Sequence, residues 1–397
     1  MKRAGYASVV FWILSMIPMS VNALGCIEVT GVASMQTDDR AFARQMAIRN
    51  AIELASMQSN LEINARSDME NFALQNQASR FTTRSKVERF SLVDEFYNEQ
   101  TNEYEVVLYV CLTADPSACG NLVGTQYQNR LVVAPVVIEN TYEGRDIANL
   151  LPGYQAELFR RLNIAGYRNL EMVEYAQGLH PGTMVTPNLS QDVLLPIQDQ
   201  TGGQFLLLSV IRSVVSVSEG RGFLDGVRRF YNYDAKHNRR YVEVEWYLVD
   251  LNKQRIVRQH LESIEMEGEP RVGRDKPFGS MAFFRTHTGQ AFDKILAQQV
   301  ERVIDHLKCE MLETQIIDVR NGEYVMFLAD QSGIQVGDQL AIYSRAGNPV
   351  RFQGRVLGMD EAPAGFIEIT RILPKFAVGR LVAEKAEIQI GDVARSW

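Results

Sequence analysis

The sequence predicts a multidomain α+β protein, with an α/β domain at each of the first two positions and a β-barrel at the end. The chain has 397 residues, whereas one domain averages roughly 150 residues. Helix-like and strand-like periods alternate up to about residue 312. Beyond that point only short strand-like runs remain, separated by Gly and Pro, which is typical of a small closed barrel.

Residues 1–23 have the pattern of a secretory signal peptide, with two basic residues, an apolar run from Ala7 to Ile17 and the small residues of "VNA". The apolar run is shorter than the roughly 20 residues of a membrane-spanning helix. We therefore expect an exported mature chain without a transmembrane segment. Acylation of Cys26 is the alternative, although "ALGC" departs from the residue order of a lipidation site.

The charge of the mature chain is acidic. The predicted signal contains Lys2 and Arg3, so 39 of the 41 basic residues remain against 48 acidic ones, a net charge near −9. Because binding of phosphates needs a concentrated basic surface, we expect no nucleic acid as partner.

Residues 24–115 are predicted to form the N-terminal α+β domain. The strand "IEVTGVASM" is followed by Thr37 and Asp38 as candidate N-caps of a helix. The runs "VERFSLVDEFY" and "EYEVVLYVCLT" then form a hairpin around "NEQTN". The helix has an Ala-rich stripe that packs closely on a sheet, formed by Ala47, Ile48, Ala51, Ile52 and Ala55.

A linker at 116–127 leads to a predicted α/β domain at 128–312. The apolar run "LVVAPVVI" is expected to be one strand covered on both faces. "GQFLLLSVIRS" is a second buried strand, and "RYVEVEWYLVD" turns through "LNKQ" into "RIVRQHLESIEM". Two amphipathic helices cover this sheet, one with Leu158 and Leu162 and one with Phe292, Ile295, Leu296, Val300, Val303 and Leu307.

Residues 313–397 are predicted to form the barrel, beginning with a hairpin at Asn321-Gly322. The motif I-Q-[VI]-G-D occurs twice in it. Gly337 and Gly391 can take a positive φ, and Asp338 and Asp392 can bond to the turn backbone, so we interpret each copy as a turn that enters a strand. An ancestral duplication and a functional loop are the other interpretations.

Four cysteines of an exported chain favour two disulfides, with three possible connectivities. The helix that ends at Cys309 is expected to run antiparallel to the strand that begins near Arg130, which brings Cys309 close to Cys119. Cys26 begins a strand and Cys111 ends one, so these two can pair if the strands are antiparallel neighbours. Pairing of Cys111 with Cys119 is the alternative.

The sequence contains no motif that indicates a catalytic, cofactor or metal site. The histidines lack a metal-binding spacing. "GRGFLDG", from Gly220 to Gly226, lacks the Lys-Ser/Thr ending of a phosphate loop, and we interpret it with "NYDAKHNRR" as a long hairpin tip. Binding or scaffolding is therefore the favoured class, with no catalytic residue.

Taken in order, these segments resemble the flagellar assembly protein T family. The resemblance rests on "IEVTGVASM", "ARQMAIRNAIELA", "LLLSVIRSVV" followed by "VEVEWYLVDLNKQRIV", the cysteine of "HLKC", "GIQVGDQLAIY" and the terminal "IQIGDV". Cys119 and Cys309 match positions where members commonly carry cysteine, whereas Cys26 and Cys111 are not a typical pair of the family.

The resemblance implies a middle domain similar to the N-terminal domain of the TolB translocation protein and an SH3-like C-terminal barrel. It also implies a periplasmic, non-enzymatic protein that forms an outer ring around the lipopolysaccharide and peptidoglycan rings of the flagellum, together called the LP ring. This ring supports a further ring of the motor proteins X and Y, which anchors the stator. Alternatives from other classes are an outer-membrane lipoprotein or secretion-system accessory, and a periplasmic hydrolase.

Overall fold

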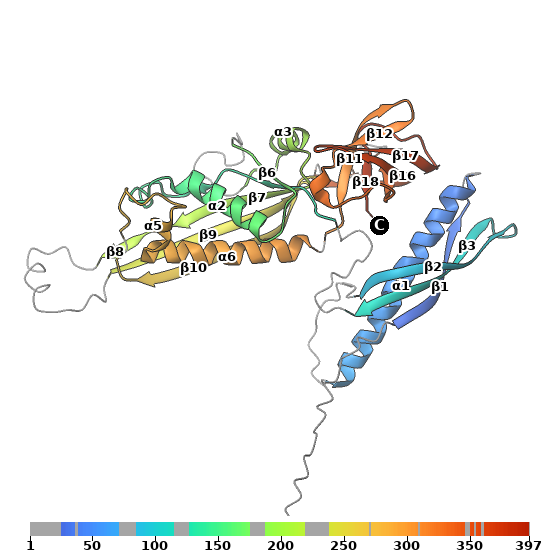
Figure 1. Cartoon of the computed structure of the whole chain (residues 1–397), viewed down its shortest axis with the longest axis horizontal. Coiled ribbons are helices and arrows are strands. Elements are labelled where there is room, and N and C mark those ends of the chain that lie inside the picture. Colours follow the sequence, from blue (N-terminus) through green and yellow to red (C-terminus); the bar gives the residue numbers. More distant parts are fainter. Residues whose placement is uncertain are drawn as a thin grey trace, which may run out of the picture.

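The computed structural model shows a mixed α/β chain with a closed six-stranded barrel in its C-terminal region (Figure 1). The predicted signal peptide, Cys119, Cys309 and the Gly220–Gly226 segment lie outside the described residues, as does nearly all of the predicted linker. The structure describes residues 25–35, 39–70, 85–114, 127–174, 187–218, 238–269, 271–308, 310–345, 350–352, 355–358 and 361–396.

The N-terminal domain is a three-stranded antiparallel sheet with one long helix along one face (Figure 1). The strand order is β1-β3-β2, so the predicted hairpin places β3 in the centre. The elements are β1 (Gly25–Ser34), α1 (Arg40–Glu70), β2 (Ser85–Asn98) and β3 (Glu103–Ala114).

Small residues let α1 approach β1 closely. Ala47, Ala51 and Ala55 are fully buried. A Cβ at Gly31 would lie 2.0 Å from the carbonyl oxygen of Ala47, so a larger residue on the strand would push the helix away. The predicted close packing of the Ala-rich stripe is confirmed.

Asp39 caps the start of α1, whereas Thr37 and Asp38, the candidate N-caps predicted from the sequence, lie outside the described residues. The helix begins at Arg40, and Asp39 Oδ1 accepts hydrogen bonds from the backbone N of Ala41 and of Phe42. Thr37, Asp38 and Asp39 are all good cap residues, and the sequence pattern does not discriminate among neighbours of the same kind.

The middle region has a mixed sheet in the order β10-β9-β7-β4-β6. β4 is parallel to its neighbours β6 and β7, and β5 is also parallel to β7. β9 is antiparallel to β7, β8 and β10. The elements are β4 (Leu131–Val133), β5 (Val137–Ile138), α2 (Leu150–Ile164), β6 (Leu170–Met172), α3 (Gln191–Thr201), β7 (Phe205–Ser213), β8 (Ser216–Ser218), β9 (Asn238–Asp250), β10 (Arg255–Glu267), α5 (Met281–Phe284) and α6 (His287–Leu307).

The run "LVVAPVVI" is two short strands, not the single strand that we predict from its apolarity. β4 ends at Val133 and β5 begins at Val137, with Pro135 between them. Proline has no N–H to donate to a ladder, so it interrupts a strand that composition alone marks as continuous.

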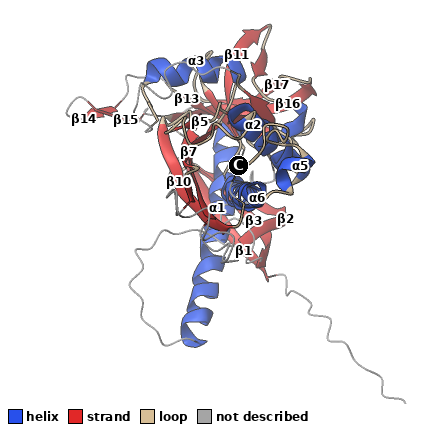
Figure 2. Cartoon of the chain, turned by 90° about the vertical axis from the view of Figure 1, so that its left-hand side faces the viewer, coloured by secondary structure: helices blue, strands red, loops and turns tan. Residues whose placement is uncertain are grey.

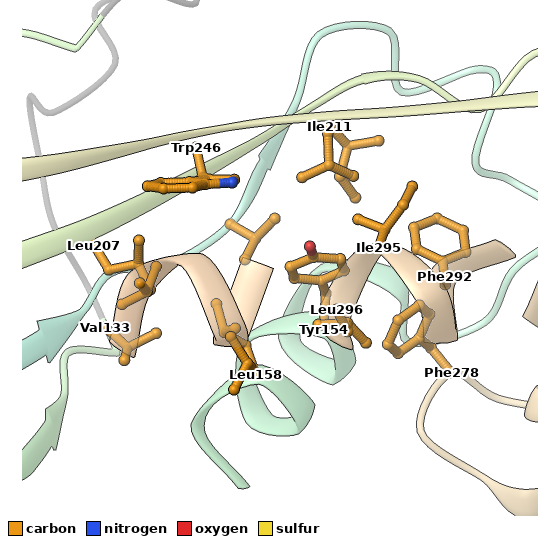
Figure 3. Close-up of a cluster of buried hydrophobic side chains, with 14 of the residues drawn as sticks. Val133, Tyr154, Leu158, Leu207, Ile211, Trp246, Phe278, Phe292, Ile295 and Leu296 are labelled. Carbon is orange, nitrogen blue, oxygen red and sulfur yellow. The ribbon is translucent and has the colours of Figure 1, made fainter. Parts of the chain in front are cut away.

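Helices α2 and α6 cover one face of this sheet, and α3 lies on the other. Figure 3 shows Tyr154 and Leu158 of α2 and Phe292, Ile295 and Leu296 of α6 in one cluster with Trp246 of β9. Within this core Tyr154 donates a 2.6 Å hydrogen bond to Gln299, whose amide donates to Ser209 at 2.9 Å. The predicted apolar stripe of α6 is buried along its whole length.

The barrel has the strand order β11-β12-β17-β16-β13-β18 and closes on itself. Asn321 and Gly322 both have positive φ, 52° and 76°, as the predicted hairpin requires. β14 and β15 form a separate hairpin that projects from the barrel in Figure 2. The elements are β11 (Glu313–Arg320), β12 (Glu323–Met326), the 3-10 turn η1 (Asp330–Ser332), β13 (Gln339–Ser344), β14 (Val350–Phe352), β15 (Arg355–Gly358), β16 (Ala362–Ile372), β17 (Ala377–Glu384) and β18 (Val393–Arg395).

Candidate functional site

The two I-Q-[VI]-G-D copies form turns with the same conformation. Gly337 has φ 98° and Gly391 has φ 95°. Each donates its backbone N–H to a neighbouring strand at 2.8 Å, Gly337 to the carbonyl of Ile369 and Gly391 to that of Ile316. A Cβ at either glycine would meet no atom within 4 Å, so backbone conformation, not space, selects glycine.

The aspartates of the motif close the same two turns. Asp338 Oδ2 accepts from the backbone N of Gln335 at 2.7 Å, and Asp392 Oδ2 accepts from that of Gln389 at 2.8 Å. The turns lead into β13 and β18. These equivalent hydrogen bonds agree with the interpretation of the motif as a turn that enters a strand.

Cys26 and Cys111 form a disulfide between β1 and β3, where they are partners in the antiparallel register. This excludes the alternative pairing of Cys111 with Cys119. Asn129 Nδ2 donates to the carbonyl of Glu310 at 3.0 Å, so the end of α6 lies beside the start of β4, as expected. Pairing of Cys119 with Cys309 stays a prediction, because both lie outside the described residues.

The first turns of α1 dock on the outside of the barrel, and we call this contact the α1–barrel contact. Asp39 Oδ2 accepts a 3.0 Å hydrogen bond from the backbone N of Glu384. The rings of Phe42 and Phe366 have centroids 5.7 Å apart, with Phe42 only 6% exposed. Phe42 packs in one apolar cluster with Ala341, Tyr343, Phe366, Ala383 and Val393, and we call these five barrel residues the groove.

Charged groups surround this contact. The guanidinium groups of Arg49, from α1, and Arg395, from β18, both lie over the ring of Tyr343, at 5.4 and 4.9 Å from its centroid. Burial, together with the charge of Arg395, lowers the pKa of Arg49. Burial alone would also lower the pKa of Arg395, but the carboxylates of Glu313 and Glu361 more than offset it and raise this pKa.

The middle region meets the barrel through a second junction. The buried side chain of Gln204 donates to the carbonyl of Met311 at 3.1 Å and accepts from the backbone N of Glu313 at 2.9 Å. Gly202, with φ 62°, lies against the ring of Phe327 from the barrel. A hollow of about 260 Å³ opens at this junction, and residues from both sides line it.

Metal-ligating side chains do not cluster in the part of the chain that the structure describes. No group of three His, Cys, Asp or Glu side chains among the described residues lies close enough to hold a metal ion. His260 and His306 lie beside Glu262 and Glu310, and the Nδ1 of His287 accepts from the backbone N of Glu269. No helix in the described part of the chain is long and apolar enough to cross a membrane.

The α1–barrel contact is not predicted from the sequence. Asp39 and Glu384 are 345 residues apart, and no local period connects them. The one sign of it in the sequence is Phe42, a large aromatic residue next to the Ala-rich stripe of α1. Phe42 belongs to the cluster with the barrel and not to the core between α1 and the N-terminal sheet.

Solved structures give distant matches. The hypothetical protein CT253 from Chlamydia trachomatis is 16% identical, with 46% of this chain and 98% of that chain covered and a TM-score of 0.33. The PelC dodecamer from Paraburkholderia phytofirmans is 10% identical, with 46% and 91% covered and a TM-score of 0.26. Lipoprotein GNA1162 from Neisseria meningitidis is 13% identical, with 45% and 98% covered and a TM-score of 0.24.

Comparison with curated proteins gives no match. The family model of flagellar assembly protein T, N-terminal domain, matches residues 25–115. This range contains β1, α1, β2 and β3, which is the whole N-terminal sheet and its helix. The resemblance to flagellar assembly protein T drawn from the sequence is thus confirmed for residues 25–115, which match the N-terminal domain of that family.

Proposed function

We propose that this chain is a non-enzymatic structural protein of the flagellar basal body. The observation that carries the proposal is the match of residues 25–115 to the N-terminal domain of flagellar assembly protein T. Flagellar assembly proteins are generally structural, and the described residues include hydrogen bonds that join the barrel to the other two units, at Asp39 and at Gln204.

The finer part of the proposal is an outer ring around the LP ring, which supports the ring of motor proteins X and Y that anchors the stator. In this proposal the middle region is the TolB-N-like domain of the family and the six-stranded barrel is its SH3-like domain. The barrel contacts both other units, α1 at one groove and Gln204 at another junction. A subunit with such a central barrel can hold two binding domains at a fixed spacing.

Two further features support a periplasmic location as part of this proposal. The Cys26–Cys111 disulfide suits an oxidising compartment, and the predicted signal peptide provides export. The disulfide also argues against the lipoprotein alternative, because the sulfur of Cys26 cannot carry a lipid thioether while it is bonded to Cys111. We find no observation in the described residues that favours the hydrolase alternative.

The test is a gene deletion with complementation by the full chain. We expect the deletion strain to assemble filaments but to lose rotation, and the complemented strain to regain it. Immunoblots should detect the protein in purified basal bodies of the complemented strain. Normal rotation in the deletion strain, or absence of the protein from basal bodies, would contradict the proposal.

A further inference from the structure

The groove that holds α1 is formed by the barrel alone. It contains side chains from β13, β16, β17 and β18, and in this chain the side chain that enters it is Phe42. The polar contacts at its rim also join the two units, since Asp39 accepts from Glu384 N and the Lys385 ammonium lies 5.9 Å from the centre of the Phe42 ring. The groove and the start of α1 are therefore a complementary pair.

The segment that joins the N-terminal domain to the rest of the chain allows the groove to bind the α1 of its own chain or the α1 of a neighbouring copy. Residues 115–126 join β3 to the middle region, and a segment of that length spans up to about 40 Å when extended. An α1 docked on the barrel of a neighbouring copy would make every contact described above, without any change inside a domain. Exchange of an identical element between copies is a low-cost route to association.

We propose that the α1–barrel contact is exchanged between neighbouring copies of this chain when the protein assembles. In the free protein the start of α1 occupies the groove of its own barrel. In the assembly it occupies the groove of the next copy, and the contact then joins subunits head to tail. This inference rests on the proposed ring function and identifies its subunit contact.

Effective concentration determines whether the groove binds the α1 of its own chain or that of a neighbouring copy. A short linker holds α1 near its own barrel at an effective concentration of the order of millimolar, which exceeds any micromolar solution of free copies. The groove of the free protein is therefore filled by its own α1, and this prevents the open-ended polymerisation to which head-to-tail contacts can lead. Copies held side by side on an existing ring are at comparable local concentration, and exchange becomes possible there.

Met46 supplies a probe of this contact. Its side chain packs against both the groove cluster and the core of its own N-terminal domain. Photo-methionine, a near-isosteric replacement, should cross-link at position 46 to barrel peptides and also to β1 and β3 peptides. The second set must join residues of one chain, so it is an internal control.

The experiment mixes equal amounts of ¹⁴N- and ¹⁵N-labelled full-length protein that contains photo-methionine. The mixture is cross-linked free at micromolar concentration and after assembly on basal bodies from a deletion strain. In the free protein, cross-links from Met46 to the barrel should join peptides of the same label. On basal bodies, about half of these cross-links should join peptides of different labels if copies mix at random.

Same-label cross-links alone on basal bodies would show that the contact stays within one chain and would overturn the inference, while the proposed function would stand. Cross-links from Met46 to β1 and β3 without any to the barrel would show that the contact does not form. Mixed-label cross-links from Met46 to the barrel in the free protein would contradict the claim that α1 occupies its own barrel before assembly. Failure to bind basal bodies at all would remove the proposed function and this inference with it.

Discussion

The carboxylate of Asp39 binds the backbone of two domains at once. Its Oδ1 caps α1 through the N–H groups of Ala41 and Phe42, and its Oδ2 accepts from the backbone N of Glu384 at the end of β17. The start of the first helix and its position on the barrel therefore depend on a single side chain.

Replacement of this carboxylate should weaken both interactions. Asp39→Ala removes an N-cap, worth about 1 kcal/mol, and a hydrogen bond to the barrel, worth about another 1 kcal/mol. We expect faster amide exchange in the first turn of α1 and at Glu384, measured by hydrogen exchange of the full-length protein. Asp94→Ala, which removes a local contact to the backbone of Glu95, is the matched control. Unchanged exchange at Glu384 in Asp39→Ala would contradict this role.

Loss of the Cys26–Cys111 disulfide should destabilise the N-terminal domain. The two residues are separated by 85 positions, for which the chain-entropy relation gives about 4 to 5 kcal/mol. We expect the double replacement by Ala to lower the unfolding midpoint of this domain, while the barrel, which has its own core, should unfold as in the native chain. Peptide mapping of non-reduced protein should recover the pair, and recovery of Cys111 with Cys119 instead would refute it.

The two turn glycines should be sensitive to replacement because of conformation alone. Gly337→Ala and Gly391→Ala each force an L-residue into positive φ at a position with free space, so each should cost about 1 kcal/mol of unfolding free energy. Val336→Ala and Ile390→Ala change the exposed neighbours, which are 64% and 66% exposed, and serve as controls. Equal urea midpoints for all four variants would mean that the turns do not select glycine.

Gly202 should respond to replacement for a different reason. A Cβ there would lie 2.3 Å from Cδ1 of Phe327, so Gly202→Ala should displace the barrel ring and cost about 1 to 3 kcal/mol by overpacking, besides the strain of its positive φ. Phe327→Ala in the same chain should relieve the overpacking, which a double-mutant cycle measures as a favourable coupling. Strict additivity of the two changes would rule out this contact.

Acid should remove a stabilising ion pair of the middle region. Burial alone would raise the pKa of Asp146, but hydrogen bonds from Arg240 and from the backbone N of Val272, and the charge of Arg240, together lower it below its ordinary value of 3.8. Because the folded pKa is depressed, the stabilisation is complete above pH of about 4 and is lost as the pH falls through the folded pKa.

Unfolding free energies measured between pH of about 2 and 6 should therefore depend less steeply on pH in Asp146→Asn than in the native chain. Asp94→Asn, on an exposed strand of the N-terminal domain, is the control. An unchanged pH dependence in Asp146→Asn would show that this pair does not contribute.

Local patterns predict the elements of this chain well. The stripe of α6 and the Asn321-Gly322 hairpin are recognised from residues close in sequence, because helix period and turn conformation are local properties. The break at Pro135 is missed because the apolar run outweighs one residue in a reading of composition.

Contacts between distant segments are the part that local patterns cannot supply. Phe42 and Phe366 belong to domains at opposite ends of the chain, and neither residue has a sequence neighbour that indicates the other. The hydrogen bond from the backbone N of Glu384 to the second oxygen of Asp39 is likewise invisible to a local pattern. Sequence patterns therefore predict local elements such as these, whereas contacts between distant segments require the structure.

Electron cryotomography of basal bodies in cells tests the central claim most directly. Averaged images of the deletion strain should lack density outside the LP ring, and images of the complemented strain should regain it. A tag on the full chain should add density at that outer ring. An outer ring that is identical with and without the gene would contradict the assignment of this chain as a structural component of the basal body.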